Sequence, residues 1–208
     1  MPTAVFVSGN GTNLQAVIEA ARKRVLPLDL RLVISNQPQA FALLRARSAA
    51  IPTAVYEFKR SHDDRARYAH TLADAVTRCG ARLVLLLGWM HILAPEFLGR
   101  GFTVLNLHPA YLPEDPSADS VTFPDGTVTP AFRGPHALRD ALHAGVPCVG
   151  ASLIEITADV DRGPLLARKA LPLRPHEDLE SALQRLHSVE QEVVREGILR
   201  WAGEHAHR

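Results

Sequence analysis

Apolar and polar residues alternate along the first half of the chain in blocks that fit strands and helices in turn. Short, continuously apolar runs fit buried strands, whereas the blocks between them repeat apolar residues at helical spacing. The strand patterns lie at 3–7, 30–34, 51–56, 83–87 and 103–107, and the helix patterns lie at 14–21, 41–49, 65–78 and 95–98. Strands that alternate with helices predict right-handed βαβ units and a mainly parallel sheet with helices on both faces.

The pattern changes after residue 109. Residues 114–131 are rich in proline, acidic and hydroxyl residues and show neither period, so we predict a flexible insertion there, either a lid or a plain surface loop. We also expect that residues 116–130 can be trimmed without loss of the fold. A helix at 135–144, antiparallel strands at 148–156 and 164–173, and a closing helix at 177–201 follow. The predicted fold is a single Rossmann-like α/β domain over residues 1–208 with a C-terminal antiparallel strand pair.

Composition narrows the classes of ligand. Hydrophobic residues make up 47% and charged residues 22% of the 208 residues, as in ordinary globular proteins, and the net charge of +1 argues against a nucleic-acid-binding surface. Cys79 and Cys148 form neither a CxxC pair nor a disulfide framework, which suits a reducing compartment. We see no signal peptide and no apolar stretch of roughly 18 residues. We therefore expect a cytoplasmic protein with small-molecule ligands, and no membrane or nucleic-acid partner.

The strand predicted at 103–107 leads into an amide and an imidazole. Asn106 and His108 are two residues apart, so their side chains point to the same face, and Pro109 should end the strand. Ligands bind at this carboxyl end of the strands in open α/β sheets. Asparagine can donate to an oxyanion, and histidine can transfer a proton near neutral pH. The alternative is an asparagine that closes a turn and a histidine that satisfies a core carbonyl.

A glycine-containing loop, residues 9–13, separates the first strand from its helix. Glycines let backbone N–H groups approach an anion, and a helix N-terminus favours negative charge, so the loop fits a phosphate. A tight turn with no ligand is the alternative. The third glycine of the dinucleotide-binding motif is replaced by Leu14, so we do not predict NAD binding.

Two later segments carry further candidates. In residues 159–164, Gly163 and Pro164 fix a turn, and Asp161 either caps that turn or charges and orients His108. In residues 87–93, backbone groups and apolar side chains either hold a flat heteroaromatic ring or pack beneath a loop.

These motifs carry a resemblance over nearly the whole chain. The sequences GNGTN at 9–13, GWMHIL at 88–93, NLHPAYLP at 106–113 and DVDRGP at 159–164 resemble, in order and spacing, the phosphoribosylglycinamide formyltransferase family of folate-dependent enzymes. The resemblance implies transfer of a formyl group from 10-formyltetrahydrofolate, the co-substrate, to the amine of phosphoribosylglycinamide in purine biosynthesis. It implies no metal and no covalent intermediate, and a monomer or homodimer.

The resemblance also implies roles for particular residues. The catalytic trio would be Asn106, His108 and Asp161. The residues that would hold the ribonucleotide are Gly11, Thr12, Asn13 and Glu190. The residues that would hold the folate are Arg65, Met90, His91, Ile92, Leu93, Asn106, Thr157, Ala158, Asp159, Val160 and Asp161. Phosphate binding would fall to the N-terminal half, about 1–100, and folate binding and catalysis to the C-terminal half, about 101–208.

The chain departs from the family pattern in two places. His91 stands where the family usually has arginine, and residues 114–131 are longer than usual before Phe132 resumes the pattern. His136 follows this insertion and is a further candidate to line the site. Methionyl-tRNA formyltransferases and formyltetrahydrofolate hydrolases share the core motif, but each usually carries a further domain, which we do not expect here. A non-catalytic nucleotide-binding module would need no proton donor, so the intact trio argues against it.

Overall fold

The computed structural model describes residues 1–59 and 64–205. The chain forms two compact units, Met1–Asn106 and Leu107–Arg208, and each is described by itself.

A parallel sheet forms the centre of the first unit. Its strands are β1 (Pro2–Val7), β2 (Asp29–Ser35), β3 (Thr53–Val55), β4 (Leu83–Leu86) and β5 (Thr103–His108), whose last two residues belong to the second unit. They lie in the order β3-β2-β1-β4-β5, and each neighbouring pair is parallel. Every residue of β4 is buried, as expected for a parallel strand covered on both faces. The predicted parallel sheet is confirmed.

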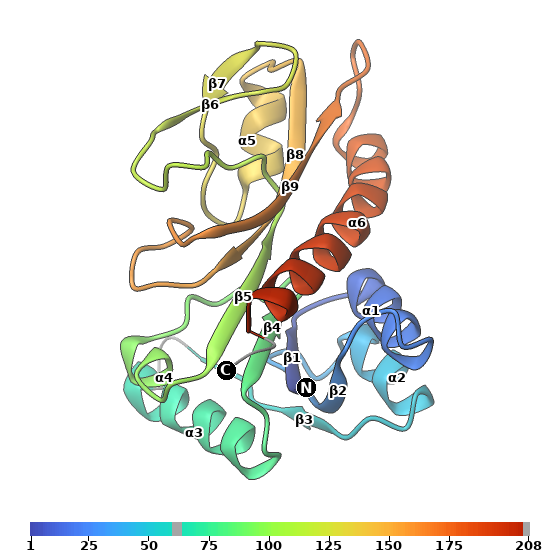
Figure 1. Ribbon diagram of the computed structural model, residues 1–208, viewed down its shortest axis with the longest axis vertical. Coiled ribbons are helices and arrows are strands. Elements are labelled where there is room, and N and C mark those ends of the chain that lie inside the picture. Colours follow the sequence, from blue (N-terminus) through green and yellow to red (C-terminus); the bar gives the residue numbers. More distant parts are fainter. Residues whose placement is uncertain (60–63, 206–208) are drawn as a thin grey trace. The chain divides into compact units, whose positions relative to one another are not determined.

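Within residues 1–59 and 64–106, four helices complete the first unit. They are α1 (Thr12–Arg22), α2 (Phe41–Ser48), α3 (Arg65–Arg78) and α4 (Pro95–Leu98). Figure 1 shows α1 beside α2 and α3 beside α4, and both pairs are in contact. The start of α3 is fixed by Asp64, whose carboxylate accepts hydrogen bonds from the backbone N–H groups of Ala66 and Arg67. The helix then buries one apolar face that includes Leu72 and Val76.

An antiparallel strand pair and two helices build most of the second unit. These elements are α5 (Ala137–His143), β8 (Cys148–Glu155), β9 (Leu165–Pro172) and α6 (Leu179–His205), and β8 pairs with β9. Neighbouring side chains of β8 pack against different helices. Leu153 lies against Gly197 of α6, whereas Ile154 clusters with Ala137 of α5, because successive side chains of a strand point to opposite faces. A Cβ atom at Gly197 would lie 2.5 Å from the Leu153 side chain, so glycine lets α6 approach the strand closely. The predicted antiparallel pair is confirmed.

The insertion is more ordered than its sequence predicts. It contains two short antiparallel strands, β6 (Ser120–Thr122) and β7 (Val128–Pro130), so the prediction of a segment without strands was wrong. Val121 and Phe123 are buried, and the Phe123 ring stacks on Tyr111 with 4.7 Å between centroids. Each strand has three residues, which is too short for a period of two to appear in the sequence. Trimming residues 116–130 would remove this packing, so we no longer expect it to be neutral.

The buried ring of Phe123 gives a direct test of this packing. Phe123→Ala should lower the free energy of unfolding by about 3 kcal/mol, since it removes a buried aromatic side chain and leaves a cavity. Val128→Ala in the same hairpin is the control, because that side chain is 64% exposed and its loss should change little. Urea unfolding of the full chain measures both values. Equal stability of the two variants would show that the hairpin is not packed as described.

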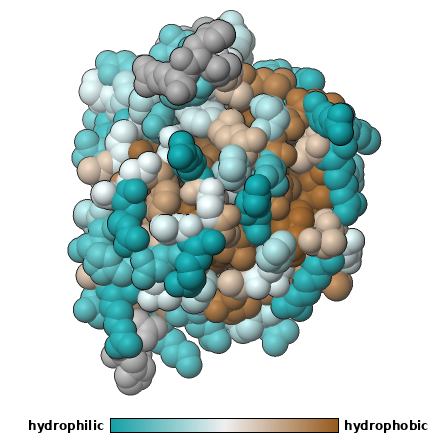
Figure 2. Space-filling view, turned by 60° about the horizontal axis from the view of Figure 1, so that its bottom comes forward, coloured by the Kyte–Doolittle hydropathy of each residue, from teal (hydrophilic) through white to brown (hydrophobic). Residues whose placement is uncertain are grey.

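The surface mixes hydrophobic and hydrophilic residues. On the face shown in Figure 2, hydrophobic patches reach the surface between hydrophilic ones. Within residues 1–59 and 64–205, no helix has the length and apolar character needed to cross a membrane. Over the same ranges, no group of three or more His, Cys, Asp or Glu side chains is placed to hold a metal ion. Scattered exposed apolar side chains such as Val128 are ordinary for globular proteins and need no functional explanation.

Candidate active site

The glycine loop of the first unit joins β1 to α1 and ends on a left-handed residue. Gly11 is the N-cap of α1 with φ 75° and ψ 31°. A Cβ atom at this position would lie 2.6 Å from the Cβ atom of Ala42 in α2. Glycine is therefore required both by the backbone conformation and by the approach of α2. Since a glycine cap brings no side-chain acceptor, the first N–H groups of α1, from Thr12 and Asn13 onward, are suited to an external anion.

An arginine of α2 braces the same loop. The Nε atom of Arg45 donates to the Asn10 carbonyl oxygen at 2.9 Å, and a terminal nitrogen donates to the Asn10 side-chain oxygen at 3.1 Å. The guanidinium thus holds Asn10, and it places a positive charge beside the loop. This contact between the loop and α2 was not predicted, because it joins residues 35 positions apart.

The segment after β4 presents backbone groups and apolar side chains. The Met90 N–H donates to Ser8 Oγ at 3.0 Å, and Arg65 of α3 donates to the Ile92 carbonyl oxygen at 3.2 Å. Met90 and Ile92 are exposed whereas Leu93 is buried. The structure therefore places Arg65 next to the segment 90–93. Two candidates for the same ligand are expected to lie close together.

His91 lies among aromatic rings. Its ring centroid is 5.6 Å from that of Trp89, 5.7 Å from that of Phe58 in an edge-on arrangement, and 6.4 Å from that of Tyr68. Edge-to-face contacts of this kind are favourable between flat rings. The aromatic neighbours give a physical reason for an imidazole at this position.

His108 and Asp161 come together in the second unit. Both side chains are buried, and His108 Nδ1 lies 3.6 Å from Asp161 Oδ2. The Nε2 atom lies 3.0 Å from the carbonyl oxygen of Phe132, which can only accept, so Nε2 donates there. Both ring nitrogens thus face oxygen acceptors.

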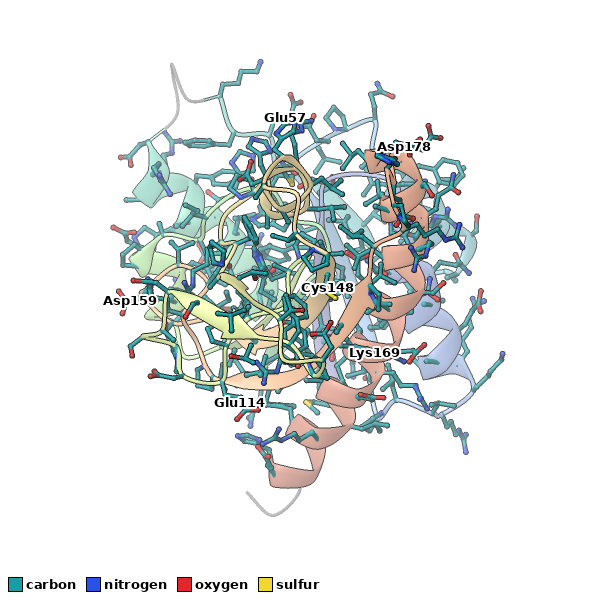
Figure 3. The ribbon with its side chains drawn as sticks, turned by 90° about the horizontal axis from the view of Figure 1, so that it is seen from above. Glu57, Glu114, Cys148, Asp159, Lys169 and Asp178 are labelled. Atoms are coloured by element: carbon teal, nitrogen blue, oxygen red, sulfur yellow. The ribbon has the colours of Figure 1, made fainter. Side chains whose placement is uncertain are left out.

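The loop that carries Asp161 is held in an unusual conformation. Asp161 has φ 53°, in the left-handed region, and its Oδ2 atom accepts a hydrogen bond from the Gly134 N–H at 2.8 Å. A Cβ atom at Gly163 would lie 1.5 Å from the Glu155 carbonyl oxygen, so a side chain there would break the turn. Before Asp161, residues 157–160 are exposed, and Figure 3 shows Asp159 at the outer edge of the view.

The remaining candidates occupy three elements. Asn106 is half-buried and lies two residues before His108 in β5, which ends at His108 as predicted from Pro109. Glu190 is buried in α6, and His136 is the exposed N-cap residue of α5. The backbone partners at Phe132 and Gly134 were missed as site residues, although these two residues resume the family pattern after the insertion.

Comparisons with known proteins identify the family of the chain. A family model described as Formyl transferase matches residues 1–121 and 126–198. The chain is 31% identical to the phosphoribosylglycinamide formyltransferase of Dictyostelium discoideum, over 93% of this chain and 94% of that protein. It is 30% identical to the phosphoribosylglycinamide formyltransferase of Escherichia coli K12, over 93% and 83%. The crystal structure of glycinamide ribonucleotide transformylase 1 from Symbiobacterium toebii is similar with a TM-score of 0.82 and 30% identity, over 95% and 85% of the two chains.

Proposed function

The chain belongs to the formyl transferase family, and from this premise we propose that it is a phosphoribosylglycinamide formyltransferase of purine biosynthesis. It would transfer a formyl group from 10-formyltetrahydrofolate to the amine of phosphoribosylglycinamide. The observation that carries the proposal is the buried His108–Asp161 pair, with 3.6 Å between Nδ1 and Oδ2. In the proposed mechanism this pair would supply the proton donor for formyl transfer to an amine.

Asn106 and His108 would act on the charge that develops during transfer. When the substrate amine attacks the formyl carbon, negative charge grows on the formyl oxygen. The Asn106 amide would donate a hydrogen bond to this oxygen, and the His108 imidazolium would stabilise it and give a proton to the folate nitrogen as its bond to the formyl carbon breaks. The neutral ring would take up the proton that the attacking amine loses, so the charge and the protons balance. Asp161 would keep the ring charged and oriented, through its carboxylate at Nδ1.

The ribonucleotide would bind through its two ends. Its phosphate would lie against the backbone N–H groups of Gly11, Thr12 and Asn13 at the start of α1, where the helix dipole favours an anion. The carboxylate of Glu190, buried in α6, would accept hydrogen bonds from the ribonucleotide.

The folate would be held by two exposed stretches and an arginine. The co-substrate supplies the formyl group. Residues 90–93 offer the exposed apolar side chains of Met90 and Ile92, and the exposed residues 157–160 would contribute backbone groups, so both stretches would suit a flat heteroaromatic ring. Arg65 would pair with acidic groups of the folate. His91, which lies among aromatic rings, would pack beside the folate.

One assay separates this function from its nearest alternatives. Ultraviolet absorbance follows loss of 10-formyltetrahydrofolate with and without phosphoribosylglycinamide, and we expect turnover only with both. Turnover without the ribonucleotide would favour a hydrolase, and no turnover in either case would favour a non-catalytic binding module. We also propose a cytoplasmic location and a monomer or homodimer, which fractionation and size-exclusion chromatography would test.

The phosphate loop makes a separate prediction. Gly11→Ala should lower the free energy of unfolding by at least about 1–2 kcal/mol, because an L-residue is disfavoured in the left-handed conformation. The clash of the new Cβ atom with Ala42, 2.6 Å away, should add to this cost. Displacing the loop should also raise KM for the ribonucleotide about tenfold, the cost of one charge-assisted hydrogen bond, with little change in KM for the folate.

Gly9→Ala is the matched control for that prediction. A Cβ atom at Gly9 would meet no heavy atom within 4 Å, so this variant should keep both its melting temperature and its KM values. Thermal melts and initial rates with each substrate varied in turn measure the two effects. If Gly11→Ala changed both KM values equally, the loop would be a turn and not a phosphate site.

A further inference from the structure

Two arginines join the insertion to the loop that carries Asp161. Arg162, the next residue after Asp161, donates from one terminal nitrogen to the Pro116 and Ser117 carbonyl oxygens at 2.8 and 3.1 Å. Its other terminal nitrogen donates to Asp119 Oδ1 at 2.6 Å. The insertion therefore accepts hydrogen bonds from the residue that directly follows the candidate catalytic carboxylate.

Arg133 makes the second connection, from the far end of the insertion. Its Nε atom donates to the Asp161 carbonyl oxygen at 3.3 Å, and a terminal nitrogen donates to the Ala118 carbonyl oxygen at 2.7 Å. The other terminal nitrogen lies 3.6 Å from Asp119 Oδ1. The carboxylate of Asp119 is thus shared by two guanidinium groups: that of Arg133, which contacts the Asp161 carbonyl oxygen, and that of Arg162, the residue after Asp161. We call Asp119, Arg133 and Arg162 the clasp.

The start of the insertion is also anchored. Arg168 of β9 donates to the Leu112 carbonyl oxygen at 2.6 Å and to Glu114 Oε1 at 2.9 Å. Its guanidinium lies over the Tyr111 ring, 4.4 Å from the centroid. Figure 3 labels Glu114, whose side chain is exposed although it pairs with Arg168. With Phe123 stacked on Tyr111, the insertion is a fixed support and can transmit a constraint to the Asp161 loop.

The Asp161 loop needs such a constraint. A non-glycine residue in the left-handed region is disfavoured and persists only where its surroundings hold it. The position of the Asp161 carboxylate matters, because its Oδ2 atom accepts a hydrogen bond from the Gly134 N–H at 2.8 Å and lies 3.6 Å from His108 Nδ1. A shift of about 1 Å in a catalytic group can lower a rate by roughly 10²-fold.

We propose that Asp119 is a positioning residue, which acts through the clasp to hold the Asp161 carboxylate against His108. The proposal deepens the proposed function and rests on it for the role of His108 in turnover. The family match is interrupted at residues 122–125, between Asp119 and Arg133, so the clasp encloses a short part of the chain that the family model does not match. The insertion would thus serve the reaction through the position of Asp161.

The electrostatics of the clasp agree with this role. The hydrogen bond from Arg162, with the charges of Arg162 and Arg133, lowers the pKa of Asp119, so its carboxylate is charged at neutral pH. Burial and the charge of Arg162 lower the pKa of Arg133, which shows that the two guanidinium groups repel each other. Asp119 is the carboxylate that both cations contact, so its loss removes the attraction that keeps them together around Asp161.

The test is Asp119→Asn, which keeps the shape of the side chain and removes its charge. We expect kcat for formyl transfer to fall about tenfold, below the 10²-fold limit for a full 1 Å displacement. Both KM values should stay within twofold, and the basic limb of the kcat–pH profile should move to lower pH. Asp119→Glu, which restores the charge, should recover part of kcat. Asp125→Asn is the control in the same hairpin, because Asp125 instead contacts Thr127 and Cys148.

A second readout does not depend on turnover. NMR titration of the His108 ring in the free protein should show a midpoint at lower pH in Asp119→Asn than in the wild type or in Asp125→Asn. An unchanged midpoint together with unchanged kcat, or a loss of thermal stability alone, would overturn the proposal and leave Asp119 a structural residue. If the wild type transferred no formyl group yet the midpoint moved, the proposed function would fail while the positioning role stood.

Discussion

Asn106→Ala should fold normally and lose about 10²–10³-fold in kcat for formyl transfer. The amide lies at the carboxyl end of β5, two residues before His108, and the proposed mechanism gives it one hydrogen bond to the developing oxyanion. Removal of one such donor typically costs this much in kcat, because the bond strengthens as the charge grows. Since the same bond contributes little to the ground state, the KM values should change far less than kcat.

The control for this variant lies on the same strand. Thr103 is also half-buried in β5 but lies at its opposite end, so Thr103→Ala should cost no more than a small loss of stability and leave kcat near that of the wild type. Circular dichroism and thermal melts would establish that both variants are folded. A folded Asn106→Ala variant with near wild-type kcat would remove Asn106 from the mechanism.

The parts of the fold that sequence predicts are those with long, regular patterns. The strand β4 is a continuous apolar run and is buried throughout, and β5 ends at His108 because Pro109 cannot continue the ladder. Helix α3 combines a capping aspartate with an apolar face at helical spacing. In each case the local signal and the packing agree, so a single stretch of sequence is sufficient.

The parts that sequence does not predict depend on contacts between distant residues. The hairpin β6–β7 is stable because Phe123 meets Tyr111, twelve residues earlier, and not because its strands are long. The left-handed Asp161 belongs to a common turn pattern in sequence, yet the N–H group that fixes its carboxylate comes from Gly134. The sequence left two alternatives for His108, a partner for a core carbonyl or a group paired with Asp161. The structure shows both contacts, since the ring lies against the Phe132 carbonyl oxygen and the Asp161 carboxylate.

Asp161→Asn should lower kcat at neutral pH by about 10²–10⁴-fold, which is the usual range for general acid–base catalysis. The change keeps the shape of the side chain and removes the negative charge 3.6 Å from His108 Nδ1. In the proposed mechanism the His108 ring acts in its protonated form and the Asp161 carboxylate stabilises that form, so loss of the carboxylate should make a higher proton concentration necessary for activity. The basic limb of the kcat–pH profile should therefore move to lower pH, and part of the lost activity should return as the pH falls.

A loss of charge elsewhere in the same unit should not have this effect. Asp140→Asn on the exposed surface of α5 removes an equal charge, so it controls for a general change in the field of the protein. NMR titration of the His108 ring should give a lower midpoint in Asp161→Asn than in the wild type, and an unchanged midpoint in Asp140→Asn. If the His108 midpoint were the same in all three proteins, the carboxylate would not charge the ring. Asp161 would then act only as the acceptor of the hydrogen bond from the Gly134 N–H, at 2.8 Å. Any loss of kcat would in that case come from a change in the position of the loop.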